Sequence, residues 1–183
     1  TTLGVELGVR DLFENPTVAT LEPHLNTGSS RPPLGAVTDR PDPLPLSSAQ
    51  RRLWFLHGVE GPSATYNVPV TTRLHGTVDV DALRAAVGDL VARHEILRTT
   101  YTEIDGEPAQ RIHDPAPGVA TFAHHTVTPE QAEPLLAALS AHPFDLAREA
   151  PLAVHLISTG DRDHLLLVNL HHIAGDGASM APL

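Results

Sequence analysis

The stretch HLLLVNLHHIAGDG, residues 164–177, combines an almost continuously apolar run with a polar end that glycines flank. A run of this kind is typical of a strand covered on both faces of a sheet. Strands and helices alternate before it: residues 68–74 and 152–158 have strand-like patterns, and residues 80–91 carry one apolar helical stripe. The sequence therefore predicts an α/β sandwich with a mixed sheet.

Capping and turn residues indicate where the remaining elements begin. Ser47 or Ser48 is suited to cap a helix that ends near His57, and Asp79 is suited to cap the helix of residues 80–91. Thr128-Pro129 is typical of another helix start. A strand is expected over Ile96–Tyr101, and Asp105-Gly106 predicts a hairpin turn into a second strand near residues 110–113.

The amino-terminal part of the chain differs in composition from the rest. Residues 1–25 have helical apolar spacing that Asn15-Pro16 interrupts, so two short helices are expected. Such short helices cannot bury their own apolar face, so this segment is interpreted as the end of another domain. Residues 26–44 are rich in proline, which predicts a semi-stiff linker, and the globular region is expected to span residues 45–183.

The composition excludes several classes of function. The net charge is −10, and all 12 basic residues are arginine, so a basic patch for nucleic acid is not expected. The chain has no cysteine, which removes disulfides, thiolate metal sites and cysteine nucleophiles. It also lacks an apolar run long enough to span a membrane. We expect an acidic cytoplasmic protein that contacts neither nucleic acid nor membrane.

The two adjacent histidines at the end of the apolar run are the strongest candidates for chemistry. Successive strand residues point to opposite faces, so His171 and His172 are expected in different environments, although the pattern alone does not tell which one faces a cleft. The divergence of these side chains and the lack of a completing ligand disfavour a metal site. A serine hydrolase is disfavoured because the chain has no G-x-S-x-G elbow.

Arg98 is unusual because it interrupts an apolar stretch that is expected to form a strand. A buried guanidinium needs a carboxylate partner to offset its lost hydration. Asp176 lies in similarly apolar sequence, so we expect these two side chains to form an ion pair. Such a pair would fix the turn that follows His172.

Three stretches together resemble the condensation domains of nonribosomal peptide synthetases. They are LSSAQRRLWFL at residues 46–56, RHEILRTTY at residues 93–101, and the H-H-x-x-x-D-G motif at residues 171–177. Their order and spacing fit the family, and the resemblance covers residues 45–183. Residues 3–25 separately resemble the last helices of a peptidyl carrier domain, whose phosphopantetheine-bearing serine lies upstream in that family and is not in this chain.

The resemblance implies a two-lobed fold similar to chloramphenicol acetyltransferase, of which this chain would supply the amino-terminal lobe. It implies that His172 is the catalytic histidine and that the Gly177 backbone N–H contacts the thioester or its oxyanion. Asp176 would be structural and paired with Arg98, with His171 and His94 in support. The family often has tryptophan after D-G, where this chain has Ala178.

The activity that the resemblance implies is peptide-bond formation between a carrier-bound aminoacyl or peptidyl thioester donor and an aminoacyl acceptor. The partners would be donor and acceptor peptidyl carrier domains and an adjacent adenylation domain, in a pathway such as antibiotic or siderophore biosynthesis. No metal and no directly bound cofactor are expected; substrates would arrive on the 4′-phosphopantetheine of the carriers. We expect the chain alone to be inactive, because the second lobe is absent. An epimerisation or dual epimerisation/condensation domain and a non-catalytic carrier-recruiting module are the alternatives.

Overall fold

The computed structural model describes residues 9–24 and 39–180. The chain divides into two compact units, and the division falls between Arg40 and Pro41. Among the residues described, no helix is both long and apolar enough to cross a membrane.

The amino-terminal unit contains three short helices: α1 (Val9–Glu14), α2 (Val18–Leu21) and the 3-10 helix η1 (Glu22–His24). Thr17 caps α2 in a reciprocal capping box with Thr20. The large apolar side chains are exposed, with Leu12 at 49%, Phe13 at 82% and Val18 at 85%. α1 and α2 correspond to the two short helices expected here, and the 3-10 helix η1 was not predicted; the apolar side chains of α1 and α2 are exposed. The assignment of residues 1–25 to a carrier domain stays a prediction, and most of the predicted linker, residues 26–38, lies outside the described residues.

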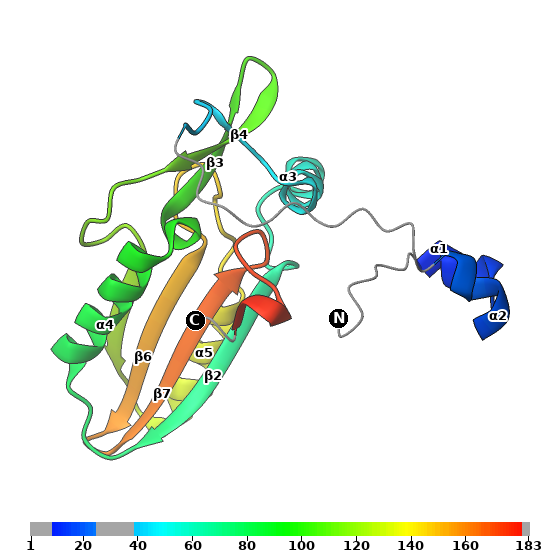
Figure 1. Ribbon diagram of the computed structural model, residues 1–183. Coiled ribbons are helices and arrows are strands. Elements are labelled where there is room, and N and C mark those ends of the chain that lie inside the picture. Colours follow the sequence, from blue (N-terminus) through cyan, green and yellow to red (C-terminus); the bar gives the residue numbers. More distant parts are fainter. Residues whose placement is uncertain (1–8, 25–38, 181–183) are drawn as a thin grey trace. The chain divides into compact units, whose positions relative to one another are not determined.

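The second unit is built on a four-stranded sheet with the order β2-β7-β6-β5 (Figure 1). Its strands are β2 (Asn67–His75), β5 (Thr121–Thr126), β6 (Leu152–Gly160) and β7 (Asp163–His171). β5 and β6 run parallel and the other pairs run antiparallel, so the sheet is mixed, as predicted. A smaller sheet has the order β1-β4-β3, with β1 (Leu44–Pro45), β3 (Thr99–Ile104) and β4 (Glu107–Ile112).

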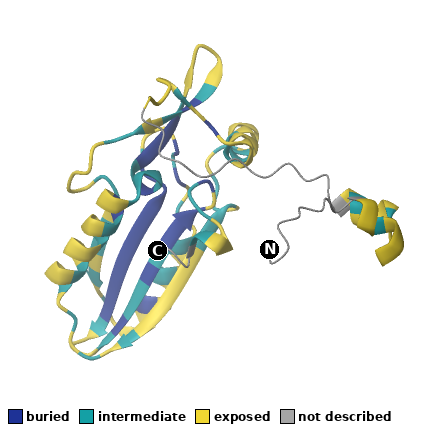
Figure 2. Cartoon of the chain, in the orientation of Figure 1, coloured by how far each residue is buried: buried dark blue, intermediate teal, exposed yellow. Residues whose placement is uncertain are grey.

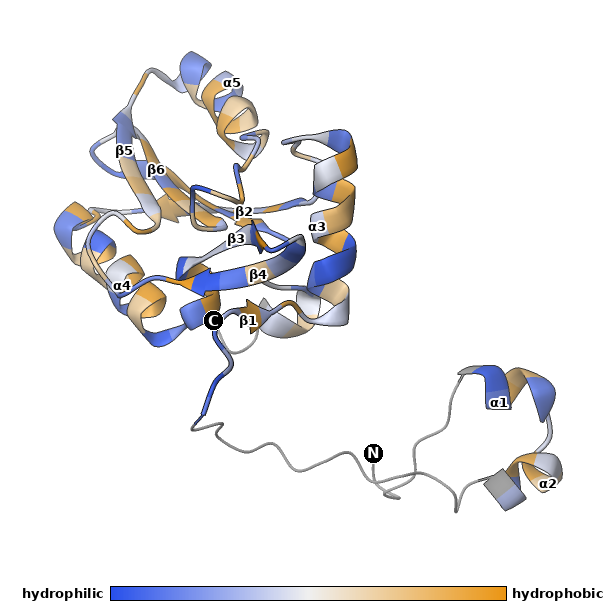
Figure 3. Cartoon of the chain, turned by 90° about the horizontal axis from the view of Figure 1, so that it is seen from above, coloured by the Kyte–Doolittle hydropathy of each residue, from blue (hydrophilic) through white to orange (hydrophobic). Residues whose placement is uncertain are grey.

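Helices cover both faces of the larger sheet (Figure 3). α4 (Val80–Arg93) packs through Val91 against Leu152, Val154 and Leu170 on one face. α5 (Pro129–Ser140) lies on the other face, where its last carbonyls meet the side chain of Asn169. Because side chains alternate along β7, Asn169 and Leu170 point to opposite faces, which places the two helices on opposite sides of the sheet.

The core is centred on β6 rather than on β7 (Figure 2). Every residue from Leu152 to Ser158 is buried, whereas Leu165, Leu166 and Val168 of β7 remain partly exposed. The expectation that the run of residues 164–172 is covered on both faces is therefore only partly correct. β7 lies next to the edge strand β2, although Leu170 near its end belongs to the same buried cluster as Val91 of α4.

Local capping signals in the sequence located the helix starts well. Ser47 caps α3 (Ser48–Glu60) in a capping box with Gln50, Asp79 accepts two backbone N–H bonds at the start of α4, and Thr128 forms a capping box at the start of α5. Asp105 and Gly106 both have positive φ, 52° and 81°, and form the predicted hairpin turn between β3 and β4.

Two elements differ from the prediction. Residues 96–101 do not form one strand: Glu95–Arg98 is the 3-10 helix η2, and β3 begins only at Thr99. β5 was not predicted, because its sequence TFAHHT is polar rather than apolar. The structure gives those polar groups partners on β6, since His124 contacts Ser158 and His125 contacts His155.

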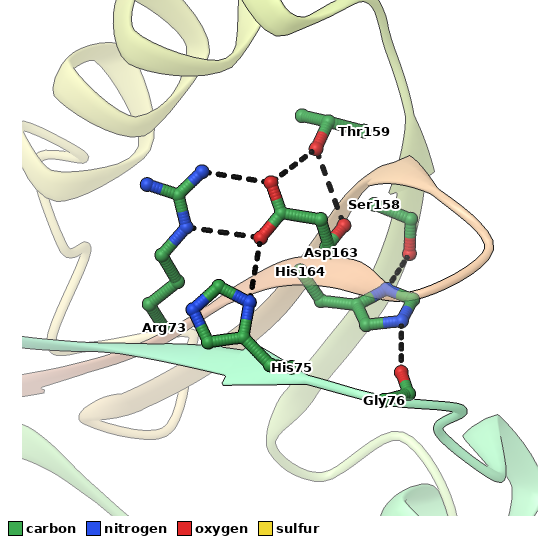
Figure 4. A network of polar contacts seen from close by, with 7 residues as sticks. All are labelled: Arg73, His75, Gly76, Ser158, Thr159, Asp163 and His164. Atoms are coloured by element: carbon green, nitrogen blue, oxygen red, sulfur yellow. Dashed lines mark hydrogen bonds and ion pairs between the residues drawn. The ribbon is translucent and has the colours of Figure 1, made fainter.

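A polar network holds β2 in register with β7 at the end of the sheet remote from His171 (Figure 4). Arg73 donates two hydrogen bonds to Asp163, of 2.9 and 2.7 Å, and His75 Nδ1 lies 3.4 Å from the same carboxylate. The hydrogen bond from Arg73 lowers the pKa of Asp163 to about 2, against the smaller effect of desolvation. His164 bridges Ser158 Oγ and the Gly76 carbonyl oxygen nearby.

Candidate active site

The two adjacent histidines occupy different environments at the end of β7, as strand alternation predicts. His171 is 1% exposed, whereas His172 is exposed. The backbone N–H of His171 donates to the carbonyl of Pro151, the residue before β6, and that of His172 donates to the carbonyl of Tyr66, the residue before β2. The site is therefore anchored on backbone at both positions.

His171 is a neutral, buried hydrogen-bond acceptor. Its Nδ1 accepts the backbone N–H of Ile173 at 3.1 Å, and its ring lies against the rings of His57, Tyr66 and Phe144. Desolvation lowers the pKa of His171 to about 4, and the neighbouring His57 and His172 add to the effect. Because the neutral ring accepts at Nδ1, its proton is on Nε2.

His172 has the opposite tautomer. Its Nδ1 lies 2.8 Å from the carbonyl oxygen of Gly175. A carbonyl oxygen only accepts hydrogen bonds, so Nδ1 must carry the proton, and Nε2 of the neutral ring is left with its lone pair. His172 is thus presented as a proton acceptor on the molecular surface.

A cavity of about 370 Å³ lies beside His172. Its walls come from three separate parts of the sequence: the start of α3, Ile96 and the turn after β7. The lining residues are Ser47, Ala49, Gln50, Leu53, Ile96, His172, Ile173, Ala174, Gly175, Asp176 and Ser179. The three stretches that carry the sequence resemblance therefore meet at one place.

One apolar cluster beneath the cavity explains why these stretches converge. Leu46, Tyr101 and Ile173, one from each stretch, belong to the same buried cluster, and Trp54 packs against it. Gln50 links the cap of α3 to this cluster, since its side chain accepts the Ser47 N–H and its Nε2 lies 3.5 Å from the Tyr101 hydroxyl. Burial raises the pKa of Tyr101 above its ordinary value, so this phenol stays protonated.

Asp176 caps the short 3-10 helix η3 (Gly177–Met180). Its carboxylate accepts the backbone N–H of Ser179 at 3.0 Å and the Ser179 hydroxyl at 2.8 Å, while its own N–H donates to that hydroxyl oxygen. These bonds from Ser179 lower the pKa of Asp176. Gly177 is exposed and follows directly, and a side chain at this position would meet no atom within 4 Å.

Arg98 and Asp176 both lie within the described residues, and they do not form the predicted ion pair. Arg98 ends η2 instead of lying within a strand, so its guanidinium donates to the His113 carbonyl oxygen and lies 3.7 Å from Glu95. Asp176 is exposed and bonded to Ser179. His94 lies at the end of α4, with a buried Nε2 that has no partner among the described residues, and it does not line the cavity.

Two asparagines support the site and were not predicted: Asn169 is buried and Asn67 is partly buried. Asn67 donates from Nδ2 to the Ser140 and His142 carbonyls, both at 2.9 Å. Asn169 donates to the Leu139 and Ser140 carbonyls, at 3.1 and 3.2 Å. Together they tie the carboxyl end of α5 to β2 and β7, immediately beside the two strand ends that hold His172. Asn169 could have been noticed in the sequence, because it is a polar residue inside the apolar run and lies on the same face of the strand as His171.

The described residues contain no group of three or more His, Cys, Asp or Glu side chains placed to hold a metal ion. His125 and His155 are a close pair of imidazoles, with Nε2 and Nδ1 3.2 Å apart. Desolvation lowers the pKa of His155 to about 4, and the charges of His125 and His142 contribute further.

The chain is similar in sequence to known proteins. A family model described as a condensation domain matches residues 41–183. The chain is 46% identical to CymA of Salinispora arenicola, a probable nonribosomal peptide synthetase, over all of the chain and 2% of that protein. It is 44% identical to the dimodular nonribosomal peptide synthase of Bacillus subtilis, over 99% of the chain and 8% of that protein.

Solved structures show the same fold. The X-domain of teicoplanin biosynthesis, in its complex with OxyB, superposes with a TM-score of 0.74 and 38% identity, over 84% of this chain and 33% of that one. The first condensation domain of the calcium-dependent antibiotic synthetase superposes with a TM-score of 0.66 and 25% identity, over 75% and 35% of the two chains. The chain thus spans about a third of these solved chains and a few per cent of the curated relatives.

Proposed function

We propose that this chain, which belongs to the condensation-domain family, forms the histidine-bearing part of a domain that makes peptide bonds between carrier-bound thioesters. The observation that carries the proposal is the tautomer of His172. The hydrogen bond from Nδ1 to the Gly175 carbonyl leaves a basic Nε2 beside a cavity, where an attacking amine needs a proton acceptor.

In the proposed reaction, His172 is the only side chain that takes up and returns a proton. The α-amine of the acceptor attacks the carbonyl carbon of the donor thioester, and a C–N bond forms. His172 Nε2 accepts the proton that the amine loses, and the C–S bond then breaks. The departing thiolate takes the proton back from His172, which leaves an amide and a free thiol. Because a thioester is already activated, positioning and electrostatic stabilisation supply much of the rate.

Gly177 and Asp176 have supporting roles in this proposal. The Gly177 backbone N–H lies at the start of η3, and we assign it to the oxyanion that forms on the thioester carbonyl. Asp176 fixes this helix start through Ser179. His171 holds the turn through Ile173 and, being buried and neutral, serves as a positioning residue.

Thioesters on carrier domains require a surface on which the carrier docks, and α3 offers one. Phe55 is 67% exposed and Val59 is 70% exposed, one helical turn apart on the helix whose first residues line the cavity. Phe55 and Val59 are the exposed large apolar residues of α3, and we assign carrier docking to them. Phe55→Ser is expected to raise the KM for a carrier-bound substrate with little change in kcat. Ile104→Ser, at an apolar residue of the β3–β4 hairpin that is 41% exposed, is the control.

The decisive experiment uses a synthetase that carries this chain, with donor and acceptor carriers and their adenylation domains. His172→Ala is expected to lower the rate of peptide formation by at least 100-fold, in the range that general base catalysis supplies. His75→Ala, an exposed histidine at the other end of β2, is the matched control and is expected to leave the rate unchanged. Near-normal peptide formation by His172→Ala would contradict the proposal, and racemisation at the donor Cα would indicate epimerisation instead.

A second candidate function is recruitment of a partner enzyme without catalysis. The observation that favours it is the likeness to the X-domain in complex with OxyB, which has a higher identity and TM-score than the condensation domain of the calcium-dependent antibiotic synthetase. This function predicts that the unaltered protein makes no peptide bond from defined L- and D-aminoacyl donors, and that it binds a partner with equal affinity when His172 is alanine.

A further inference from the structure

A second cavity, larger than the one at His172, lies on the flank of α4. Its volume is about 540 Å³, within the range of small-molecule sites. It is bounded by α4, the segment 115–120 and Phe122 of β5, and it shares no lining residue with the cavity at His172. Most of its wall is apolar, from Val87, Val91, Phe122 and several prolines and alanines.

Two opposite charges on neighbouring turns of α4 also line this cavity. Asp81 and Arg84 are three residues apart, which places their side chains on the same face of the helix. Among residues 9–24 and 39–180, neither the Asp81 carboxylate nor the Arg84 guanidinium has a hydrogen-bonding or ionic partner, and the two do not pair with each other. The Arg84 guanidinium carbon instead lies 4.6 Å from the centroid of the Phe122 ring, which holds the cation over the apolar wall.

The space in front of α4 is kept open by a glycine. Gly88 lies inside the helix, where glycine is among the least favourable residues. A Cβ built on Gly88 would meet no atom within 4 Å, so packing does not require glycine here. Because Gly88 lines the cavity one turn from Arg84, a side chain at this position would occupy the cavity.

These features together select one ligand chemistry. A simple carboxylate would be attracted by Arg84 and repelled by Asp81, and a simple amine would meet the reverse. An α-amino acid carries an ammonium and a carboxylate on the same carbon, next to its side chain. We propose that this cavity binds a free α-amino acid with a large apolar side chain, with its carboxylate on Arg84, its ammonium on Asp81 and its side chain against Phe122.

This site is separate from the proposed transfer reaction, which uses amino acids attached to carriers. Titration calorimetry on the full chain at pH 7 is expected to detect binding of L-phenylalanine. 3-Phenylpropionate, which lacks the ammonium, and phenethylamine, which lacks the carboxylate, are expected to bind at least 10-fold more weakly. Equal binding of all three compounds, or no binding of L-phenylalanine at 10 mM, would overturn the proposal.

Variants locate the binding to this cavity. Gly88→Leu is expected to abolish binding of L-phenylalanine without lowering the midpoint of thermal unfolding, because leucine favours the helix and meets open space. Gly58→Leu is the matched control: Gly58 lies inside α3, also has no atom within 4 Å of a built Cβ, and is remote from the cavity lining. Arg84→Gln, on the surface of α4, is expected to weaken binding at least 10-fold. Retained affinity in Gly88→Leu or Arg84→Gln would refute the assignment.

Discussion

The buried histidines predict that the second unit loses stability as the pH falls through a defined window. His155 and His171 are 6% and 1% exposed, and desolvation lowers the pKa of each from 6.5 to about 4. The folded-state pKa lies below the unfolded value, so the unfolded chain takes up these protons first. The stabilisation is therefore fully present above about pH 6.5 and is lost as the pH falls toward 4.

The size of the effect follows from the number of protons. Each proton bound only by the unfolded chain changes the free energy of unfolding by about 1.4 kcal/mol per pH unit, so the two histidines together give a slope of about 3 kcal/mol per unit at most. Between pH 6.5 and 4.5 the loss amounts to about 5 kcal/mol as an upper limit, comparable with the roughly 5–15 kcal/mol total stability of a typical domain.

Urea unfolding at a series of pH values measures this slope. Trp54 is the only tryptophan and packs against the core cluster of the second unit, so its fluorescence reports unfolding of that unit. His155→Gln removes one of the two protons and is expected to reduce the slope to about 1.4 kcal/mol per pH unit. His75→Gln, an exposed histidine, is the control and is expected to keep the full slope. A pH-independent free energy of unfolding between pH 4.5 and 6.5, or an unchanged slope in His155→Gln, would refute the reasoning.

Two further predictions concern the supports of the site. Asn169→Leu removes both donors from the Leu139 and Ser140 carbonyls and is expected to cost about 1–3 kcal/mol in the free energy of unfolding, measured with urea at pH 7; a neutral result would show that the clamp on α5 is dispensable. Asp176→Ala removes the cap of η3 and is expected to lower both the thermal unfolding midpoint and turnover, whereas Asp176→Asn retains an acceptor for the Ser179 N–H and is expected to keep most of both. A fully stable but inactive Asp176→Ala protein would instead give Asp176 a direct part in the chemistry.

Helix caps and turns, which depend on residues close together in the sequence, could be predicted. The strand β5, which depends on contacts between residues far apart in the sequence, could not. The caps at Ser47, Asp79 and Thr128 and the turn at Asp105-Gly106 are satisfied within three or four residues, so the sequence located them. β5 was missed because the polar His124 and His125 find their partners on β6, about thirty residues later along the chain. No local pattern records that pairing.

The same distinction holds within the site. The opposite environments of His171 and His172 follow from strand geometry alone and were predicted. The Arg98–Asp176 pair was inferred from the need of a buried guanidinium for a partner, and that need is real. Because η2 turns Arg98 toward Glu95 and the His113 carbonyl oxygen, these two groups take the place of Asp176 as partners of the guanidinium. The chemical requirement was correct, and the unforeseen backbone conformation changed the partner.

The orientation of the His172 ring depends on the Gly175 carbonyl and not on the carboxylate of Asp176. A histidine base is often oriented by a carboxylate, but here the Gly175 carbonyl oxygen receives the Nδ1 proton. For that carbonyl to reach the ring, residue 175 must approach β7 closely: a Cβ at this position would lie 3.0 Å from Leu170 Cδ2 and 3.3 Å from Ser179 Cβ. Asp176 then holds Ser179 in place from the other side. Gly175→Ala is therefore expected to require a shift of a few tenths of an ångström in Leu170 Cδ2, in Ser179 or in the turn. A shift of the turn would weaken the bond from Nδ1 to the residue 175 carbonyl, which fixes the tautomer that has its lone pair on Nε2.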